Sequence, residues 1–415
     1  MDAERGVRGE VGFIAPVEGL RGVAVLLVMV FHYALVLDAR FADPWIAASE
    51  AWLAAKVVVR NGMLGVDLFF LITGFLLVLP WLRHAADGGA APSATAFYRR
   101  RVRRILPAYY VHLLILFLVL VPLLRGLEFW RYDPAHLFTN LSAHVFLVHY
   151  LSPVTSASVG VNGALWTLSL EAQFYLLLPL LAPAFARAPW RTALALLATA
   201  LAWRWAAGHG LDALVASLQA QVPTQVSEQT MRHFLQTQLP GYLGHFAAGM
   251  LAARAWLQWR DHPPSRAASI AWLALAACAG LLLWSLHAPG GWLLGDLTWA
   301  LVLAALATIL VALVARGVAA ARSLLANRPL LFVGRVSYSA YLYHLPVILL
   351  WNLYAPAVSG SWVVFPSYVA TVLAIAWLSY RYVEVPGMAS ASASPREAPP
   401  QWPQPEAQPR PTGPA

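Results

Sequence analysis

The feature that most constrains this chain is a series of apolar segments, each about 20 residues long, that runs through most of the sequence. A helix of that length can cross the hydrocarbon core of a bilayer. Hydrophobic residues make up 60% of the chain and charged residues 11%, whereas soluble domains carry about 25% charged residues. The sequence therefore excludes a soluble nucleic-acid-binding protein and predicts an all-α, polytopic transmembrane bundle.

Ten segments have the length of a membrane span. They cover approximately Val17–Leu37, Met63–Leu82, Ile105–Leu124, Leu165–Phe185, Trp190–Ala207, Leu239–Leu257, Ala267–Ala288, Leu293–Ala315, Leu331–Leu353 and Trp362–Val383. With a cytoplasmic N-terminus, this arrangement places most of the 28 basic residues on the cytoplasmic side, as the positive-inside rule requires. A further span at His136–Leu151 would place most of them outside. We therefore expect that segment not to cross and both termini to be cytoplasmic.

The composition changes after Pro386. Residues 1–386 are predicted to form one membrane-embedded domain. Residues 387–415 are rich in Pro, Ala, Ser and Gln and are predicted to form a disordered cytoplasmic tail, because they contain too little apolar surface to form a core. The single cysteine, Cys278, leaves no possibility of a disulfide within the chain or of a cysteine-based zinc site, and no metal site is expected.

The first span holds an arginine and a histidine. Arg21 lies near its cytoplasmic end, and His32 follows about three helical turns later, roughly 16 Å away and on nearly the same face. A neutral imidazole in a polar cavity is suited to act as a general base. The alternative is that Arg21 extends to the interface and that a neighbouring helix satisfies His32.

Other spans also contain polar residues, and ionisable groups there are functional candidates because burying them in a membrane is costly. Thr167 and Glu171 share one helix face. Ser337, Tyr341 and His344 share another face in the span Leu331–Leu353, where Pro346 predicts a kink. A buried ion pair that fixes helix packing is the alternative for Glu171.

Asp67 and Thr73 lie in the second span, and Arg381 and Glu384 lie at the end of the last. A helix-terminal charge and small-residue packing are the alternatives for the first two. Arg381 and Glu384 are expected to form a surface pair.

Five arginines precede the third span: Arg99, Arg100, Arg101, Arg103 and Arg104. Such a cluster orients a membrane helix and contacts anionic lipid. The forked guanidinium group also recognises phosphates. Both interpretations remain open from the residues alone.

Together these motifs resemble acyltransferase family 3 of integral membrane proteins, which includes polysaccharide and O-antigen O-acetylases. The resemblance runs from Val17 to Pro386. Its motifs correspond here to Arg21 and His32, Thr73-Gly74-Phe75, Arg101 and Arg104, Trp166 through Tyr175, and Ser337, Tyr338, Tyr341 and His344. The chain departs from the family pattern in three places: Thr73 replaces the usual serine, Glu18 replaces the more common aspartate, and Ala172 stands where a second acid is common.

The resemblance implies transfer of an acyl group from a cytoplasmic acyl-CoA, such as acetyl-CoA, to a hydroxyl of a glycan or glycolipid acceptor at the extracytoplasmic face of a bacterial cytoplasmic membrane. No permanently bound cofactor is implied. The candidate residues fall into three groups: catalytic, His32, Arg21, Glu171, Tyr341 and His344; acyl-CoA-binding, Arg101 and Arg104; and cavity-lining, Asp67, Thr73, Trp166 and Ser337. A proton-coupled transporter or flippase is the competing class, because buried His, Asp and Glu residues suit it equally well.

Overall fold

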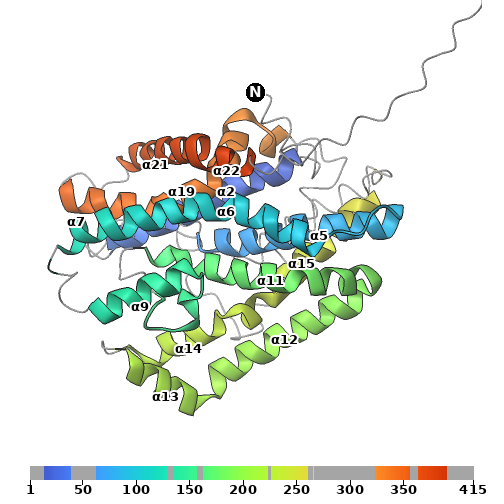
Figure 1. The fold of residues 1–415 in the computed structure, drawn as a ribbon, viewed down its shortest axis with the longest axis horizontal. Coiled ribbons are helices and arrows are strands. Elements are labelled where there is room, and N and C mark those ends of the chain that lie inside the picture. The colour runs from blue at the N-terminus through green and yellow to red at the C-terminus, as the bar shows by residue number, and fades with distance from the viewer. Residues whose placement is uncertain are drawn as a thin grey trace, which may run out of the picture.

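The computed structural model describes residues 14–38, 62–126, 128, 134–156, 162–222, 226–259, 265, 323–355 and 363–389. Every regular element in these ranges is helical (Figure 1). The longer helices are α2 (Ala15–Asp38), α5 (Leu64–Asp87), α6 (Ala94–Ile115), α11 (Trp166–Arg187), α12 (Pro189–His209), α15 (Leu239–Trp259), α19 (Arg328–Tyr354) and α21 (Phe365–Ser379). The shorter elements are η2 (Leu116–Leu120), α7 (Val121–Arg125), α9 (Pro134–Val145), η3 (His149–Leu151), η4 (Gly163–Leu165), α13 (Asp212–Gln221), α14 (Glu228–Gln236), η5 (Tyr380–Glu384) and α22 (Val385–Ala389).

Four described helical segments are long and apolar enough to cross a membrane by length and composition: Ala15–Leu35, Leu64–Asp87, Ala94–Arg125 and Gly163–Arg187. Their outward surfaces carry leucines that are more than half exposed, such as Leu118 and Leu180, as lipid-facing helices require. The described helices α12, α15, α19 and α21 coincide with further predicted spans. The predicted spans Ala267–Ala288 and Leu293–Ala315 lie outside the described residues, as do Cys278 and residues 390–415.

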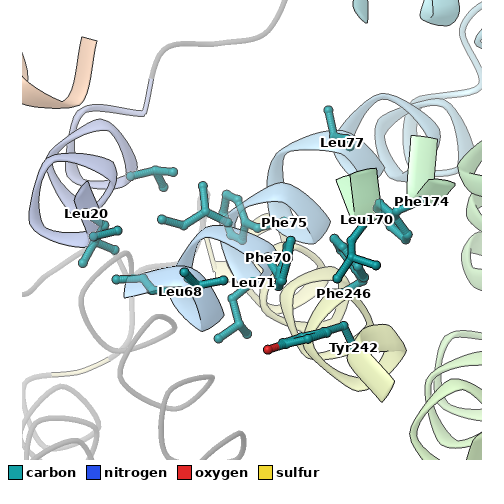
Figure 2. Packing of buried hydrophobic residues seen from close by; sticks show 14 of the residues in the cluster. Leu20, Leu68, Phe70, Leu71, Phe75, Leu77, Leu170, Phe174, Tyr242 and Phe246 are labelled. Atoms are coloured by element: carbon teal, nitrogen blue, oxygen red, sulfur yellow. The ribbon is translucent and has the colours of Figure 1, made fainter. Parts of the chain in front are cut away.

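The centre of the bundle is the contact between α5 and α15. Gly74 lies against the backbone of Phe246, and Gly249 lies against that of Leu71, so a side chain at either glycine would collide with a carbonyl oxygen. The two glycines thus let the helix backbones approach closely. Phe174 of α11 stacks on Phe246 with ring centroids 3.6 Å apart, which adds a third helix to this core (Figure 2).

Helices α2 and α19 form a second close pair. Gly334 of α19 lies against the carbonyl of Glu18, and Gly22 of α2 lies against that of Leu330. Arg21 of α2 bonds Ser337 of α19, and further along both helices His32 lies beside His344. Because residue numbers rise together in the two contacts, the helices run parallel.

Helix α6 begins earlier than the predicted span Ile105–Leu124. It starts at Ala94, where the Ser93 hydroxyl accepts a hydrogen bond of 3.4 Å from the Ala96 amide, a common N-cap arrangement. The arginine cluster is therefore part of the helix instead of preceding it. Arg101 and Arg104 are three residues apart, which places them on one helix face.

Helix α19 runs without interruption through Pro346. Proline cannot donate to the carbonyl four residues earlier, and here that carbonyl belongs to Leu342. The side-chain amide of Asn162 donates to it at 3.0 Å. A neighbouring segment thus satisfies the backbone group that the proline leaves free.

The predicted surface pair of Arg381 and Glu384 is wrong. Glu384 is 3% exposed and accepts a hydrogen bond of 2.5 Å from Ser339, whereas Arg381 packs over the Tyr382 ring. Residues Tyr380–Glu384 form a π-helical turn. The wider turn changes which face Glu384 occupies, so the i,i+3 rule for an α-helix does not apply.

The elements α9, α13 and α14 lie at one end of the bundle, and the C-terminal end of α5 and the N-terminal end of α6 lie at the other (Figure 1). Helix α9 has 12 residues and is about 18 Å long. The hydrocarbon core of a bilayer is about 30 Å thick. The end of the bundle that holds α9, α13 and α14 is called the α9–α14 end below.

Candidate active site

A cavity of about 160 Å³ lies among α2, α5, α6, α11 and α19. Most of the predicted site residues line it: Arg21, Thr73, Arg101, Arg104, Glu171, Ser337 and Tyr341. Apolar side chains, including Phe69, Phe70 and Leu168, complete the wall. The helices bring these residues together from positions more than 300 apart in sequence, and the result is a polar cavity inside an apolar bundle.

Two cavity arginines form no direct salt bridge with a described carboxylate, although Glu171 lines the same cavity. Among the residues that the structure describes, no carboxylate lies within 4.0 Å of Arg101 or Arg104. The buried Nε atom of Arg101 also has no hydrogen-bond partner there. A buried cation without a directly bonded counter-ion is costly. These two guanidinium groups are therefore suited to bind an anion, and phosphate matches their donor geometry.

The third cavity arginine is held by its neighbours. Arg21 donates to the Glu18 carboxylate at 3.3 Å and to the Ser337 hydroxyl at 3.0 Å. Its position is thus fixed by one contact within α2 and one contact to α19. Because Ser337 accepts from Arg21, its own hydroxyl proton is available for a second bond.

The direct hydrogen-bond partners of Glu171 are hydroxyl groups, and the alternative of a direct ion pair is not observed among the described residues. Thr73 donates to its Oε1 at 3.2 Å, and Tyr175 donates to its Oε2 at 2.9 Å. Both Glu171 and Thr167 line the cavity, which confirms that they share a helix face. Thr73 thereby keeps the hydroxyl of the serine that is usual in the resembling family.

His32 and His344 form a contact beside the cavity. The Nδ1 of His32 is 3.0 Å from the Val28 carbonyl, and the Nδ1 of His344 is 2.7 Å from the Tyr341 carbonyl. A carbonyl only accepts, so both Nδ1 atoms carry a proton. The Nε2 of His344 is 3.2 Å from the Nδ1 of His32 and accepts from it. In the neutral pair, the basic nitrogen of His32 is therefore Nε2.

Tyr341 connects the cavity to this histidine pair. Its ring lines the cavity and lies 5.4 Å from the His344 ring, centroid to centroid. Its hydroxyl donates to the Ala164 carbonyl at 2.8 Å and accepts from Thr167 at 2.9 Å. Because that proton is already donated to the backbone, Tyr341 forms a fixed wall of the cavity and is not a free donor.

Asp67 and Trp166 lie outside the cavity lining. Asp67 pairs with His245 of α15 at 2.8 Å. The Trp166 ring packs against Phe70 and Tyr242, with centroids 6.3 and 5.7 Å away. His32 and His344 are not in the lining either. The structure thus brings seven of the predicted residues into one cavity and the other four to positions around it.

Sequence reasoning missed several polar contacts. His245 is an ionisable residue within the predicted span Leu239–Leu257, and the rule that singled out His32 applied equally to it. Tyr175 belongs to the motif around Glu171, but its spacing of i,i+4 was not used. Asn162 had no signal of its own, although the carbonyl that Pro346 leaves free implied an unidentified donor.

Comparison with known proteins identifies the family. The family described as "Acyltransferase domain" matches residues 14–381, and the chain belongs to it. The helices and the family together define a multi-pass membrane acyltransferase. No solved structure matches the chain.

Three relatives illustrate the similarity. The peptidoglycan O-acetyltransferase OatA of Listeria monocytogenes is 25% identical over 398 residues, which cover 90% of this chain and 56% of the relative. Nodulation protein 10 of Rhizobium leguminosarum is 28% identical over 344 residues, 78% of this chain and 82% of the relative. A putative O-acetyltransferase of Staphylococcus aureus (strain COL) is 24% identical over 391 residues, 90% of this chain and 57% of the relative. The chain thus spans little more than half the length of the first and third of these relatives.

Proposed function

We propose that the protein is an O-acyltransferase that moves an acyl group, most simply acetyl, from acyl-CoA to a hydroxyl of a glycan or glycolipid acceptor. The observation that carries this proposal is the cavity in which Arg101 and Arg104 form no direct salt bridge with any described carboxylate, next to a pair of histidines with defined tautomers. O-acetyltransferases among the relatives support the reaction class. Family membership favours acyl transfer over proton-coupled transport.

In this proposal Arg101 and Arg104 bind the phosphates of acyl-CoA. Arg21 and His32 are roughly 16 Å apart along α2. An extended donor with phosphates at one end and a thioester at the other fits that separation. The thioester would then lie toward Tyr341 and His32, while the phosphates remain at the cytoplasmic side, where the arginine cluster lies in the proposed topology.

His32 is proposed as the general base. Its Nε2 takes the proton of the acceptor hydroxyl while the oxygen attacks the thioester carbonyl carbon. The carbon–sulfur bond then breaks, and the protonated histidine returns the proton to the CoA thiolate. The products are the O-acyl acceptor and free CoA, with no net change in protons. Arg21 and Ser337 lie about three helical turns from His32 and are proposed to bind the donor beside Arg101 and Arg104, away from the thioester.

His344 is proposed as the positioning residue for His32. Its Nε2 accepts from His32 Nδ1 and, together with the Val28 carbonyl, fixes the ring and keeps the basic nitrogen at Nε2. When His32 becomes protonated, the same contact stabilises the Nδ1–H. The carbonyl of Tyr341 fixes the tautomer of His344 in turn, as an orienting group does in other general-base systems.

We further propose a bacterial cytoplasmic membrane location with both termini and the α5–α6 loop in the cytoplasm. The α9–α14 end then faces the extracytoplasmic side, where the acceptor is modified. The arrangement of basic residues supports this orientation.

The test is turnover by the purified protein in liposomes. With acetyl-CoA and envelope glycan of the source cells, we expect release of free CoA that depends on the glycan, and acetylated glycan by mass spectrometry. Acetyl-CoA that stays intact in the presence of glycan, together with a proton flux across the liposome, would favour the transporter class instead.

A further inference from the structure

A polar groove of about 870 Å³ lies at the α9–α14 end, between the C-terminal end of α12 and helix α14. Ligand sites commonly have volumes of about 300–1,000 Å³. The groove is lined by Gly208, His209, Glu228, Gln229, Thr230, Arg232, His233 and Gln236. This lining shares no residue with the arginine cavity.

Helix α14 builds the groove with one of its two faces. Met231 and Leu235 on the other face are buried against Ala207 and Val215. The polar residues at positions 229, 232, 233 and 236 recur with helical spacing and line the groove. The apolar face thus holds α14 in place, and the polar face offers hydrogen-bonding groups.

Arg232 fixes the walls of the groove. Its guanidinium donates to the Gly210 carbonyl at 2.8 Å, and it pairs with Asp212 at 2.5 Å and with Glu228 at 2.7 Å. These partners come from the end of α12, from α13 and from α14. A groove tied together in this way loses little conformational entropy on binding a ligand.

The chemistry of the lining suits a neutral, hydroxyl-rich ligand. Two carboxylates pair with Arg232, so these three side chains together carry no excess of positive charge, in contrast to the arginine cavity. The remaining groups include the amide of Gln229 and the imidazole of His233, which both donate and accept hydrogen bonds. His209 stacks with the exposed ring of Trp205, which adds an aromatic surface beside the groove.

A series of side-chain contacts links the end of α14 to the wall of the cavity. Thr237 follows Gln236 in the chain, and its hydroxyl is 2.6 Å from that of Tyr150. The Tyr150 ring packs on Trp166 at 5.1 Å, and Trp166 contacts Phe70, which lines the cavity. This series of contacts runs from the end of α14 to the wall of the cavity.

We propose that this groove binds the sugar chain of the acceptor and thereby directs one of its hydroxyls toward the reaction site. The inference rests on the proposed function for the identity of the acceptor. The groove is separate from the donor cavity and from His32, so changes in it alter acceptor binding without altering donor binding.

The test is direct binding, without acetyl-CoA, of a neutral oligosaccharide digest of the source cells' envelope glycans to the purified full chain. The test variant is Gln229→Ala with His233→Ala, because both side chains are exposed. The control is Gln221→Ala on neighbouring α13, outside the groove lining. Losing two hydrogen-bonding groups should weaken binding about tenfold or more.

We expect the control to bind like wild type and the double variant to bind about tenfold more weakly, with acetyl-CoA affinity unchanged in both. Equal binding by wild type and the double variant, or no binding by either, would overturn the inference and leave α14 with an ordinary solvated face. Turnover with acetyl-CoA is measured separately, so a failure of the proposed function appears as absent CoA release, whatever the oligosaccharide binding.

Discussion

Two side-chain contacts link the parallel helices α2 and α19, and they define both halves of the candidate site. Arg21 bonds Ser337 at the cavity, and His32 bonds His344 beyond Tyr341. Because each contact joins the same two helices, a shift of one helix along the other would disturb both. The site therefore depends on the register of this helix pair.

The first prediction concerns the donor phosphates. Replacing both Arg101 and Arg104 with lysine removes the forked donors but keeps the charges. We expect the affinity for acetyl-CoA to fall about tenfold or more, with normal insertion, as measured by isothermal titration calorimetry on purified protein. The matched control is the double lysine variant of Arg99 and Arg100, which lie outside the cavity lining. Wild-type affinity for acetyl-CoA in the Arg101/Arg104 variant would show that the arginine cluster only orients the helix in the membrane.

The second prediction concerns the orientation of the base. In His344→Leu one of the two acceptors for His32 Nδ1 is lost and only the Val28 carbonyl remains, so kcat should fall by about 10-fold or more while the KM for acetyl-CoA stays unchanged. His344→Gln offers an amide oxygen to the same proton and should recover part of the loss. If the leucine and glutamine variants have the same kcat, the His344 side chain contributes only packing and does not orient His32.

Single residues were partly predictable from the sequence. Ionisable side chains in apolar spans are visible without a structure, and this rule found His32, Glu171 and His344. It could not pair them, because Glu171 bonds Thr73 from 98 positions away and His32 bonds His344 from 312 positions away. The rule also did not separate Asp67, whose partner is His245, from the residues that line the cavity.

At the scale of helices, glycines decide which pairs approach closely. The contacts of Gly74 and Gly249 bring α5 against α15, and α5 contributes Phe69, Phe70 and Thr73 to the cavity wall. Packing between α5 and α15 thus holds the part of α5 that lines the cavity.

The third prediction tests that support. In Gly249→Ala the added methyl group meets the Leu71 carbonyl, which is backbone and cannot swing aside. We expect a loss of about 1–3 kcal/mol in stability, seen as a lower Tm in a detergent thermal-shift assay. Gly89→Ala is the control, because nothing lies within 4 Å of its added Cβ. An unchanged Tm in Gly249→Ala would show that the two helices separate without cost.

The positions of the described helices were largely predictable, because apolar length determines them. Their ends and irregular turns were not. The Ser93 cap extends α6 to include the arginine cluster, and the π-helical turn at Tyr380–Glu384 buries Glu384. Both depend on local hydrogen bonds that hydropathy does not report.

At the scale of the whole molecule, the cavity and the groove lie in different parts of the bundle and differ in charge. In the described part of the chain, two of the three cavity arginines form no direct salt bridge, whereas the groove arginine pairs with two carboxylates. Such a division fits the proposed transfer from a charged donor on one side of the membrane to a sugar acceptor on the other. The arginine cluster in the sequence predicted the charged cavity. The groove could not be predicted, because its lining comes together only when α12, α13 and α14 are folded together.

The fourth prediction tests the orientation of the molecule. In a Cys278→Ser background, Gln221→Cys on α13 should react with a membrane-impermeant thiol reagent in intact cells. Asp87→Cys, at the end of α5, should react only after permeabilisation. The reverse pattern would contradict the proposed topology.

If His32 is the general base, its imidazole is required for acyl transfer, and the purified His32→Ala variant tests this requirement. General-base groups contribute about 100- to 10,000-fold to rates. We expect His32→Ala to insert normally and to bind acetyl-CoA with the wild-type Kd, but to lose acyl transfer by a factor in that range. His84→Ala, at the end of α5 and outside the cavity lining, serves as the control with full activity. Near-normal specific activity in purified His32→Ala would contradict the general-base role of His32. The proton acceptor would then be Glu171 or His344.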